Sequence, residues 1–292
     1  MKKSLIALSS VLAFSVAAGA VPLNDYTAPT AVYAAQYQIN NSMETITAEG
    51  YGRMPGGMPD GAAKVLARRA AVADAQRNLL ESVKGVAIDS ETTVENFMLK
   101  DDVIHTKVNG IITGARVISE EAQDGVYKVT MAVPVYGVGS IADVAITAVV
   151  GDKAPVPVPA PSADYVPNKN VSISGNYSGL VINVRDKGLV RTFCPAIYDT
   201  NGRAIYGVYN VDKKYAIDYG VVGYAKGPEG WGKVSAGTSR AGIKPLVIEA
   251  VGVRERTVNK CDVVISVEDA DRILAENQRS HFLDNYAVMF EI

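Results

Sequence analysis

The sequence predicts an α+β protein with two small domains, in which helices pack on mostly antiparallel sheets. Three observations predict this class. An alanine-rich helical segment at 61–84 follows a strand-like segment, a turn at 123–125 joins two alternating segments, and a proline-rich segment at 151–169 divides the chain. With 292 residues, the chain has the length of about two ordinary domains.

Composition excludes several classes of protein. The chain is 48% hydrophobic and 21% charged, with a formal net charge of −2. These values exclude a disordered protein, a collagen-like repeat and a strongly basic nucleic-acid binder. Two cysteines and two histidines are too few for a zinc-finger array or a dense disulfide scaffold.

Residues 1–35 have the pattern of a secretory signal peptide. A lysine pair at 2–3 precedes a mostly apolar run at 5–18, which is shorter than the about 20 apolar residues that span a membrane. Small-residue cleavage sites lie at 18–20 and 32–35, and the second is favoured because the residues before it lack any folded periodicity. An uncleaved anchor is the alternative. We expect an exported protein, in the periplasm or cell envelope or outside the cell.

The exported chain is expected to carry neither a lipid nor a membrane span. No cysteine follows the apolar run, so no thiol is available for acylation. Removing residues 1–35 leaves 27 basic and 30 acidic residues, which gives no electrostatic reason to bind nucleic acid or an anionic membrane.

The first domain, residues 36–150, is expected to begin with a strand at 44–52 and an amphipathic helix at 61–84. Asp60 is placed to cap the helix and Gly85 to end it. At 100° per residue, one apolar face is predicted to pack on a sheet. Its members are Val65, Leu66, Val72, Ala73, Leu79, Leu80 and Val83.

Arg69 and Gln76 interrupt this predicted apolar face. An arginine there must reach the rim or find acceptors, because an unpaired buried charge is costly. One hypothesis is that Arg69 and Gln76 form a structural polar pair that satisfies backbone carbonyls or a carboxylate at the sheet edge. The alternative is that the apolar face simply ends at its rim.

The rest of the first domain is expected to combine a β-rich segment, two helices and a hairpin. Residues 86–94 are β-rich, 101–112 favour a helix, and 140–150 favour a closing helix. The strands 115–121 and 126–136 flank the hairpin turn. These elements indicate an α+β domain.

The segment 151–169 is expected to be an extended linker. Prolines at 155, 157, 159 and 161 remove backbone donors and fix φ, which excludes a helix or a central strand. Such a segment is typical of a semi-rigid spacer, and a docking site for a proline-reading domain is the alternative.

The second domain, residues 170–292, is expected to be rich in strands. Ser266 and Asp269 resemble a capping box that begins a helix ending near residue 277. The predicted strands are 171–174, 179–184, 195–198, 204–209, 215–219, 245–251, 262–266 and 285–292.

No catalytic, metal or cofactor motif is found. Gly50-Tyr-Gly52 lacks the third glycine of a dinucleotide fingerprint, and Gly56–Gly61 lacks the lysine of a phosphate-binding loop. His105 and His281 have no metal-ligand companions, and no Gly-x-Ser-x-Gly elbow occurs. We therefore expect no cofactor and no enzymatic activity.

Two other sets of residues leave alternatives open. Cys194 and Cys261 would close a loop of about 67 residues worth about 4 kcal/mol if they paired, but each is equally well placed as a small buried apolar residue. A tyrosine-rich stretch at 206–231 either stacks on cell-wall glycan or forms the packed face of a strand.

Several segments together resemble a known family. Ala48-Glu-Gly-Tyr-Gly52, the helix with Ala70-Ala-Val-Ala-Asp-Ala-Gln-Arg-Asn-Leu-Leu-Glu81, and Val133-Pro-Val135 are similar to the LPP-twenty lipoprotein-like domain over about residues 44–137. That domain occurs in bacterial envelope lipoproteins, in the flagellar protein FlgP and, in related form, in the flagellar assembly protein FlgT. Residues 178–185 and 195–202 resemble a C-terminal extension of longer members. This chain departs from the lipoprotein members because it lacks the acylated cysteine.

The resemblance implies an exported structural or interaction protein of the bacterial envelope, linked to a flagellar or other surface assembly. It supplies no catalytic residues. The implied partners are other envelope proteins or a second copy of the chain. A binding module for cell-wall glycan or another envelope ligand is the alternative, and an exported enzyme comes third.

Overall fold

The computed structural model describes residues 26–27, 40–41, 45–167 and 173–292. The predicted signal peptide lies outside these residues except for Tyr26–Thr27, which form β1 and pair antiparallel with β2 (Asn40–Asn41). The α+β class is confirmed: helices pack on separate sheets, and in the chain the proline-rich segment separates two groups of elements.

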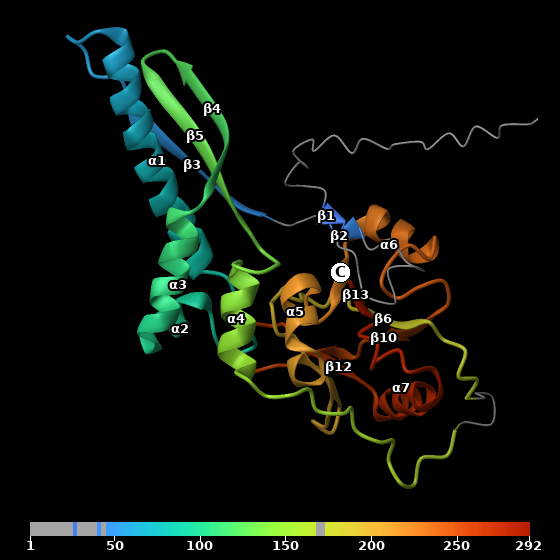
Figure 1. Ribbon diagram of the computed structural model, residues 1–292. Coiled ribbons are helices and arrows are strands. Elements are labelled where there is room, and N and C mark those ends of the chain that lie inside the picture. Colours follow the sequence, from blue (N-terminus) through green and yellow to red (C-terminus); the bar gives the residue numbers. More distant parts are fainter. Residues whose placement is uncertain (1–25, 28–39, 42–44, 168–172) are drawn as a thin grey trace, which may run out of the picture.

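A long two-layer arm projects from the first half of the molecule (Figure 1). Its sheet has the central strand β5 (Val126–Pro134) between β3 (Thr45–Arg53) and β4 (Arg116–Gln123), all antiparallel. The helix α1 (Asp60–Lys84) covers one face of this sheet. The predicted hairpin is confirmed. Asp124 and Gly125 adopt φ values of 51° and 76°, which suit a tight two-residue turn.

The predicted packing face of α1 is confirmed in the second half of the helix, at Leu79 and Val83, and wrong in the first half, where Val65 and Leu66 are exposed. The buried residues repeat every fourth position: Ala63, Ala67, Ala71, Ala75, Leu79 and Val83. The physical reason lies in β3, where Gly50 and Gly52 face the helix. A Cβ atom at either glycine would collide with the α1 backbone, so only a small-residue face approaches the sheet this closely.

The two ends of α1 differ in how well they were predicted. Pro59 occupies the N-cap position and Asp60 is the first helical residue, so the predicted Asp60 cap is not present. The Asp60 carboxylate still lies in the first turn, where the helix dipole favours it. Gly85 ends the helix as predicted, and its N–H donates to the Glu81 carbonyl.

Three shorter helices complete the first half. They are α2 (Val94–Lys100), α3 (Asp102–Thr113) and α4 (Ile141–Val150), of which α3 and α4 confirm the predicted helices. The predicted β-rich segment 86–94 contains one isolated bridge between Ala87 and Thr93. It is a turn instead of a strand, because Asp89 accepts hydrogen bonds from the backbone N–H groups of Glu91 and Thr92.

The second half contains two four-stranded sheets, and one of them contradicts the predicted antiparallel pairing. In the first sheet all neighbours are parallel, in the order β10 (Pro245–Glu249), β6 (Gly179–Asn183), β13 (Val288–Glu291), β9 (Gly223–Ala225). Strands buried on both faces, as β6 and β13 largely are, are typical of parallel sheets. The second sheet is mixed, in the order β11 (Gly252–Val253), β12 (Val263–Ile265), β7 (Ile197–Asp199), β8 (Ala204–Tyr206).

Helices of the second half correct one further prediction. Residues 215–219 were expected to form a strand but belong to the helix α5 (Lys213–Tyr219), because Asp212 caps the first turn by accepting from the Tyr215 N–H. The predicted Ser266 cap is confirmed at the start of α7 (Val267–Ser280). The remaining helices are η1 (Val208–Asn210) and α6 (Gly227–Ser235).

The proline-rich segment is extended, as predicted, but it lies along the second half. The Val156 N–H donates to the Tyr209 carbonyl at 2.7 Å, and Asn210 Nδ2 donates to the Val156 carbonyl at 2.9 Å. Further along, the Ser162 N–H donates to Asp271 at 2.8 Å. Residues 168–169 of the predicted linker lie outside the described part of the chain. The segment therefore acts as a bound strap over its described length.

The two halves share one continuous core, which contains Leu79 and Ile141 from the first half and Ile182 and Phe290 from the second. The helix α4 packs against both α3 and α5. Among the residues that the structure describes, no helix is long and apolar enough to cross a membrane.

Candidate functional site

A hydrogen-bonded seam joins the two halves. The Cys194 N–H donates to the Ile88 carbonyl at 2.8 Å, and the Asn259 N–H donates to the Ser90 carbonyl at 2.9 Å. Asn259 Nδ2 also donates to the Asp89 carbonyl at 2.8 Å. One side chain of the second half thus holds the turn between α1 and α2. The sequence carried no signal for this role, because Asn259 lies in an ordinary polar loop.

Both cysteines lie at this seam, as buried free thiols. Cys194 precedes β7 and Cys261 precedes β12, and these strands pair in parallel with Val263 opposite Ile197. The thiols therefore sit at the same end of two neighbouring strands, and the disulfide is not formed in this structure. Burial raises the pKa of the Cys261 thiol to about 12 and raises the pKa of the Cys194 thiol as well. Neither is a reactive thiolate at neutral pH.

A buried carboxyl group completes the seam. Burial raises the pKa of Asp262, although the Ser90 hydroxyl and the Ala196 N–H, the latter at 3.0 Å, hydrogen-bond to its carboxylate. The Arg254 guanidinium lies 3.7 Å from the same carboxylate. These partners already occupy the acceptor positions of Asp262, so the group serves the packing of the two halves.

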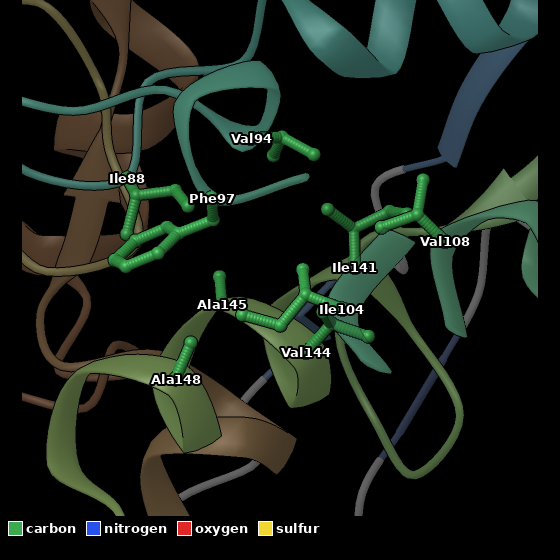
Figure 2. A pocket seen from close by; sticks show the side chains of 9 residues that line it. All are labelled: Ile88, Val94, Phe97, Ile104, Val108, Ile141, Val144, Ala145 and Ala148. Atoms are coloured by element: carbon green, nitrogen blue, oxygen red, sulfur yellow. The ribbon is translucent and has the colours of Figure 1, made fainter. Parts of the chain in front are cut away.

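An apolar pocket lies between α2, α3, α4 and the turn that follows α1, and its side chains leave no room for a water molecule (Figure 2). Phe97 and Ile88 point into it from one side, and Ala145 and Ala148 line it from α4. All nine lining residues are apolar, namely Ile88, Val94, Phe97, Ile104, Val108, Ile141, Val144, Ala145 and Ala148. Such a lining offers no group that could orient or attack a substrate.

A larger groove of about 610 Å³ lies between α3, α4 and the base of the arm. Lys107 and Arg116 are its basic residues and Asp143 is its acidic residue. Asp143 is already engaged, because its carboxylate accepts from the Gly139 N–H at 2.9 Å and from the Thr147 hydroxyl at 3.3 Å. The lining therefore combines two exposed cations with small and apolar residues.

The structure separates Arg69 from Gln76. Gln76 Nε2 donates to the Thr113 carbonyl at 3.3 Å, which is the kind of backbone acceptor expected for it. Arg69 is exposed, and no acceptor for it is found within the described residues. The hypothesis of a polar pair is therefore wrong for Arg69. The helix is rotated so that its alanines face the sheet and Arg69 lies in water.

The rotation leaves an apolar surface on α1 without cover. It is formed by Ala62, Val65, Leu66 and Ala73, with Arg69 among them, and we call these five residues the arm face. Val65 is 53% exposed and Leu66 is 46% exposed. These positions follow the spacing of three and four residues that places side chains on one side of a helix. The predicted apolar face is therefore buried at Leu79 and Val83, whereas its members Val65, Leu66 and Ala73 face solvent.

The tyrosines of the second half do not form one exposed row. Tyr206 is buried, and the Tyr215 ring packs on Tyr219 and Tyr286 with centroid distances of 4.9 Å and 4.7 Å. Tyr209 and Trp231 are exposed on different elements, η1 and α6. Most of these rings therefore contribute to packing.

Residues 179–291, from β6 to β13, match the family model of the second domain of Tp0624 from Treponema pallidum. No curated protein matches the chain. The second half is thus similar to that domain, and the match includes neither the arm nor the proline-rich strap.

Proposed function

We propose that this chain is an exported structural and interaction protein of the bacterial cell envelope, similar to the LPP-twenty lipoprotein-like group and associated with a flagellar or other surface assembly. The observation that carries the proposal is the arm face. It is an apolar surface on a helix that is anchored over its whole length by a sheet, at the projecting part of the molecule (Figure 1). Exposed apolar surfaces of this kind mark binding sites.

The rest of the molecule supports a mechanical role. The hydrogen bonds of the strap and the seam join the two halves into one body. A partner that pulls or moves the arm therefore also moves the second half. The ionisable groups at the seam are buried among hydrogen-bond partners, and the apolar pocket has no polar lining. The proposed role is therefore to bind and to space partners without transforming a molecule.

Cell fractionation followed by crosslinking tests the proposal. We expect the chain in the envelope fraction, with a new N-terminus inside residues 18–36, and crosslinked to other envelope proteins. Retention in the cytoplasm with Met1 intact, or turnover of an envelope substrate by the purified chain, would contradict it.

A further inference from the structure

We propose that copies of this chain associate head to tail, with the arm face of one copy seated on an acidic corner of the next. The inference rests on the proposed function and names its partner as a second copy. The acidic corner is the junction of α2 and α3, formed by Glu95, Leu99, Asp101, Asp102 and Val103. The proposal rests on two complementary surfaces of one chain.

Apolar exposure is the first feature that the two surfaces share. Leu99 is 80% exposed and Val103 is 62% exposed, although each is next to a buried helical residue, Met98 and Ile104. They resemble Val65 and Leu66 of the arm face, which are also large aliphatic residues in water. Bringing the two pairs together removes apolar area from water on both sides.

Charge is the second feature, and it has opposite signs on the two surfaces. Arg69 lies within the arm face and forms no ion pair with a carboxylate in the described part of the chain. At 100° per residue, Asp60 and Lys64 fall on the opposite side of the helix. The arm face is therefore apolar with one uncompensated basic residue.

The corner has the reverse charge. Glu95, Asp101 and Asp102 are exposed, and the basic residues near them are Lys100 and Lys84, the latter through a Coulombic interaction with Glu95. The Asp101 carboxylate caps α3 by accepting from the Val103 N–H at 2.7 Å, which fixes its position. An apolar surface with an acidic surround thus matches the arm face in both respects.

Geometry makes the contact intermolecular. Leu66 lies near the start of α1, whereas α2 follows the end of α1, so roughly 27 Å of helix separates the two surfaces at 1.5 Å per residue. Figure 1 shows α2 and α3 beside the opposite end of α1 from the arm tip. A rigid helix cannot bring them together within one chain.

The signs of charge also select the type of contact. If two arm faces paired, Arg69 of one copy would approach Arg69 of the other. If two corners paired, the three carboxylates of one copy would approach the three carboxylates of the other. Both contacts are repulsive, so the favourable contact is heterologous, with different surfaces from the two copies. Repetition of a heterologous contact produces a ring or a filament.

Sedimentation of the purified exported chain tests this with two variants, each blocked on one surface. Leu66→Asp places a carboxylate in the arm face, and Leu99→Asp places one in the apolar part of the acidic corner, so that the two blocked surfaces repel each other. We expect the average mass of the unmodified chain to rise with concentration and each variant to associate about tenfold or more weakly. An equimolar mixture of the two variants retains one intact surface of each kind, and we expect it to form dimers and nothing larger.

Controls separate this contact from misfolding and from other surfaces. Ile243→Asp, at an exposed residue of the second half, is expected to associate like the unmodified chain. Arg69→Glu and Asp102→Lys form a second pair of variants, each weak alone and restored when mixed, because the charges are exchanged. Circular dichroism checks the fold of every variant.

The proposal is overturned if the unmodified chain stays monomeric at all concentrations, if the blocked variants associate normally, or if the mixtures stay monomeric. These outcomes leave export and envelope partners untouched, since those are tested in cells. Failure of head-to-tail association is therefore distinct from failure of the proposed function.

Discussion

The Asp74 carboxylate of α1 accepts a hydrogen bond from the Tyr51 backbone N–H of β3 at 3.0 Å. One turn further along, Asn78 Nδ2 donates to the Glu49 carbonyl at 2.8 Å. Both backbone groups belong to the outer edge of β3, which pairs with β5 on its other side. The helix therefore covers the strand edge as well as the face of the sheet, which prevents further strands from adding there.

Loss of this edge cover should lower stability and expose β3. Asp74→Ala is expected to reduce the free energy of unfolding by about 1 kcal/mol, because water replaces part of the lost hydrogen bond at this exposed site. Urea denaturation measures the change. Glu81→Ala is the matched control, since Glu81 on the same helix forms only a surface ion pair with Lys84, and we expect a loss of less than about 0.5 kcal/mol. Equal losses in both variants would contradict the edge contact.

The close approach of α1 to β3 predicts a larger effect at the glycines. Gly50→Ala should cost about 3 kcal/mol, because the added Cβ meets the α1 backbone at Ala71 and Ala75, which must move away from the sheet. Gly56→Ala is the control, because a Cβ atom there meets no neighbouring atom within 4 Å. Thermal unfolding compares the two. A Gly50→Ala variant as stable as Gly56→Ala would show that the helix does not lie this close.

The sequence predicted the elements of the arm but not its packing. The alternation at 44–52 and the turn at 123–125 depend on local chemistry, so β3 and the hairpin were predicted correctly. The packing of the first half of α1 depends on Gly50 and Gly52, which lie in another element, so periodicity alone gave the correct face at Leu79 and Val83 but the wrong one at Val65 and Leu66. Periodicity was also insufficient at residues 215–219. Their apolar residues alternate as in a strand, but they form a helix because Asp212 caps its first turn.

Much of the candidate site was beyond the reach of the sequence for a similar reason. The seam depends on the hydrogen bond from Asn259 to the carbonyl of Asp89, which lies 170 residues away in the chain. No sequence motif predicts this contact. The arm face was visible as an apolar pattern, but its exposure followed only from the packing of the alanines.

The seam predicts that the two halves unfold together. Trp231 is the single tryptophan and lies in α6 of the second half, so its fluorescence reports on that half, while circular dichroism is dominated by the helices of both. Asn259→Ala should lower stability by about 1–2 kcal/mol, because the half-buried Asp89 carbonyl loses its partner. We expect the two signals to coincide in the unmodified chain and to separate in the variant. Separate transitions before any substitution would contradict a shared core.

Both thiols are expected to be free but inaccessible. Because burial raises the pKa of Cys261 to about 12 and also raises that of Cys194, a thiol reagent should react slowly with the native chain at pH 8. In denaturant without reductant it should titrate two thiols per chain. A count of zero would show that the exported protein forms the disulfide after all.

A titration of Glu120 tests the contact between α1 and β4. The Arg68 guanidinium and the Tyr127 hydroxyl hydrogen-bond to this carboxylate and lower its pKa to about 2. A folded-state pKa below the unfolded value means that the contact contributes stability above the ordinary pKa of glutamate and loses it as the pH falls toward 2. Magnetic resonance titration should give a pKa near 2, and Arg68→Ala should raise it. An ordinary pKa in the unmodified chain would rule out the ion pair in solution.

The most direct test of the central claim, that this chain acts by binding through its arm, is site-specific photocrosslinking in intact cells. A photoreactive residue at position 66 in the arm face is compared with one at position 243 on the second half, which is at least as exposed. We predict crosslinks to a second copy or to other envelope proteins from position 66 and few from position 243. Equal crosslinking from both positions, or none from position 66, would contradict the account.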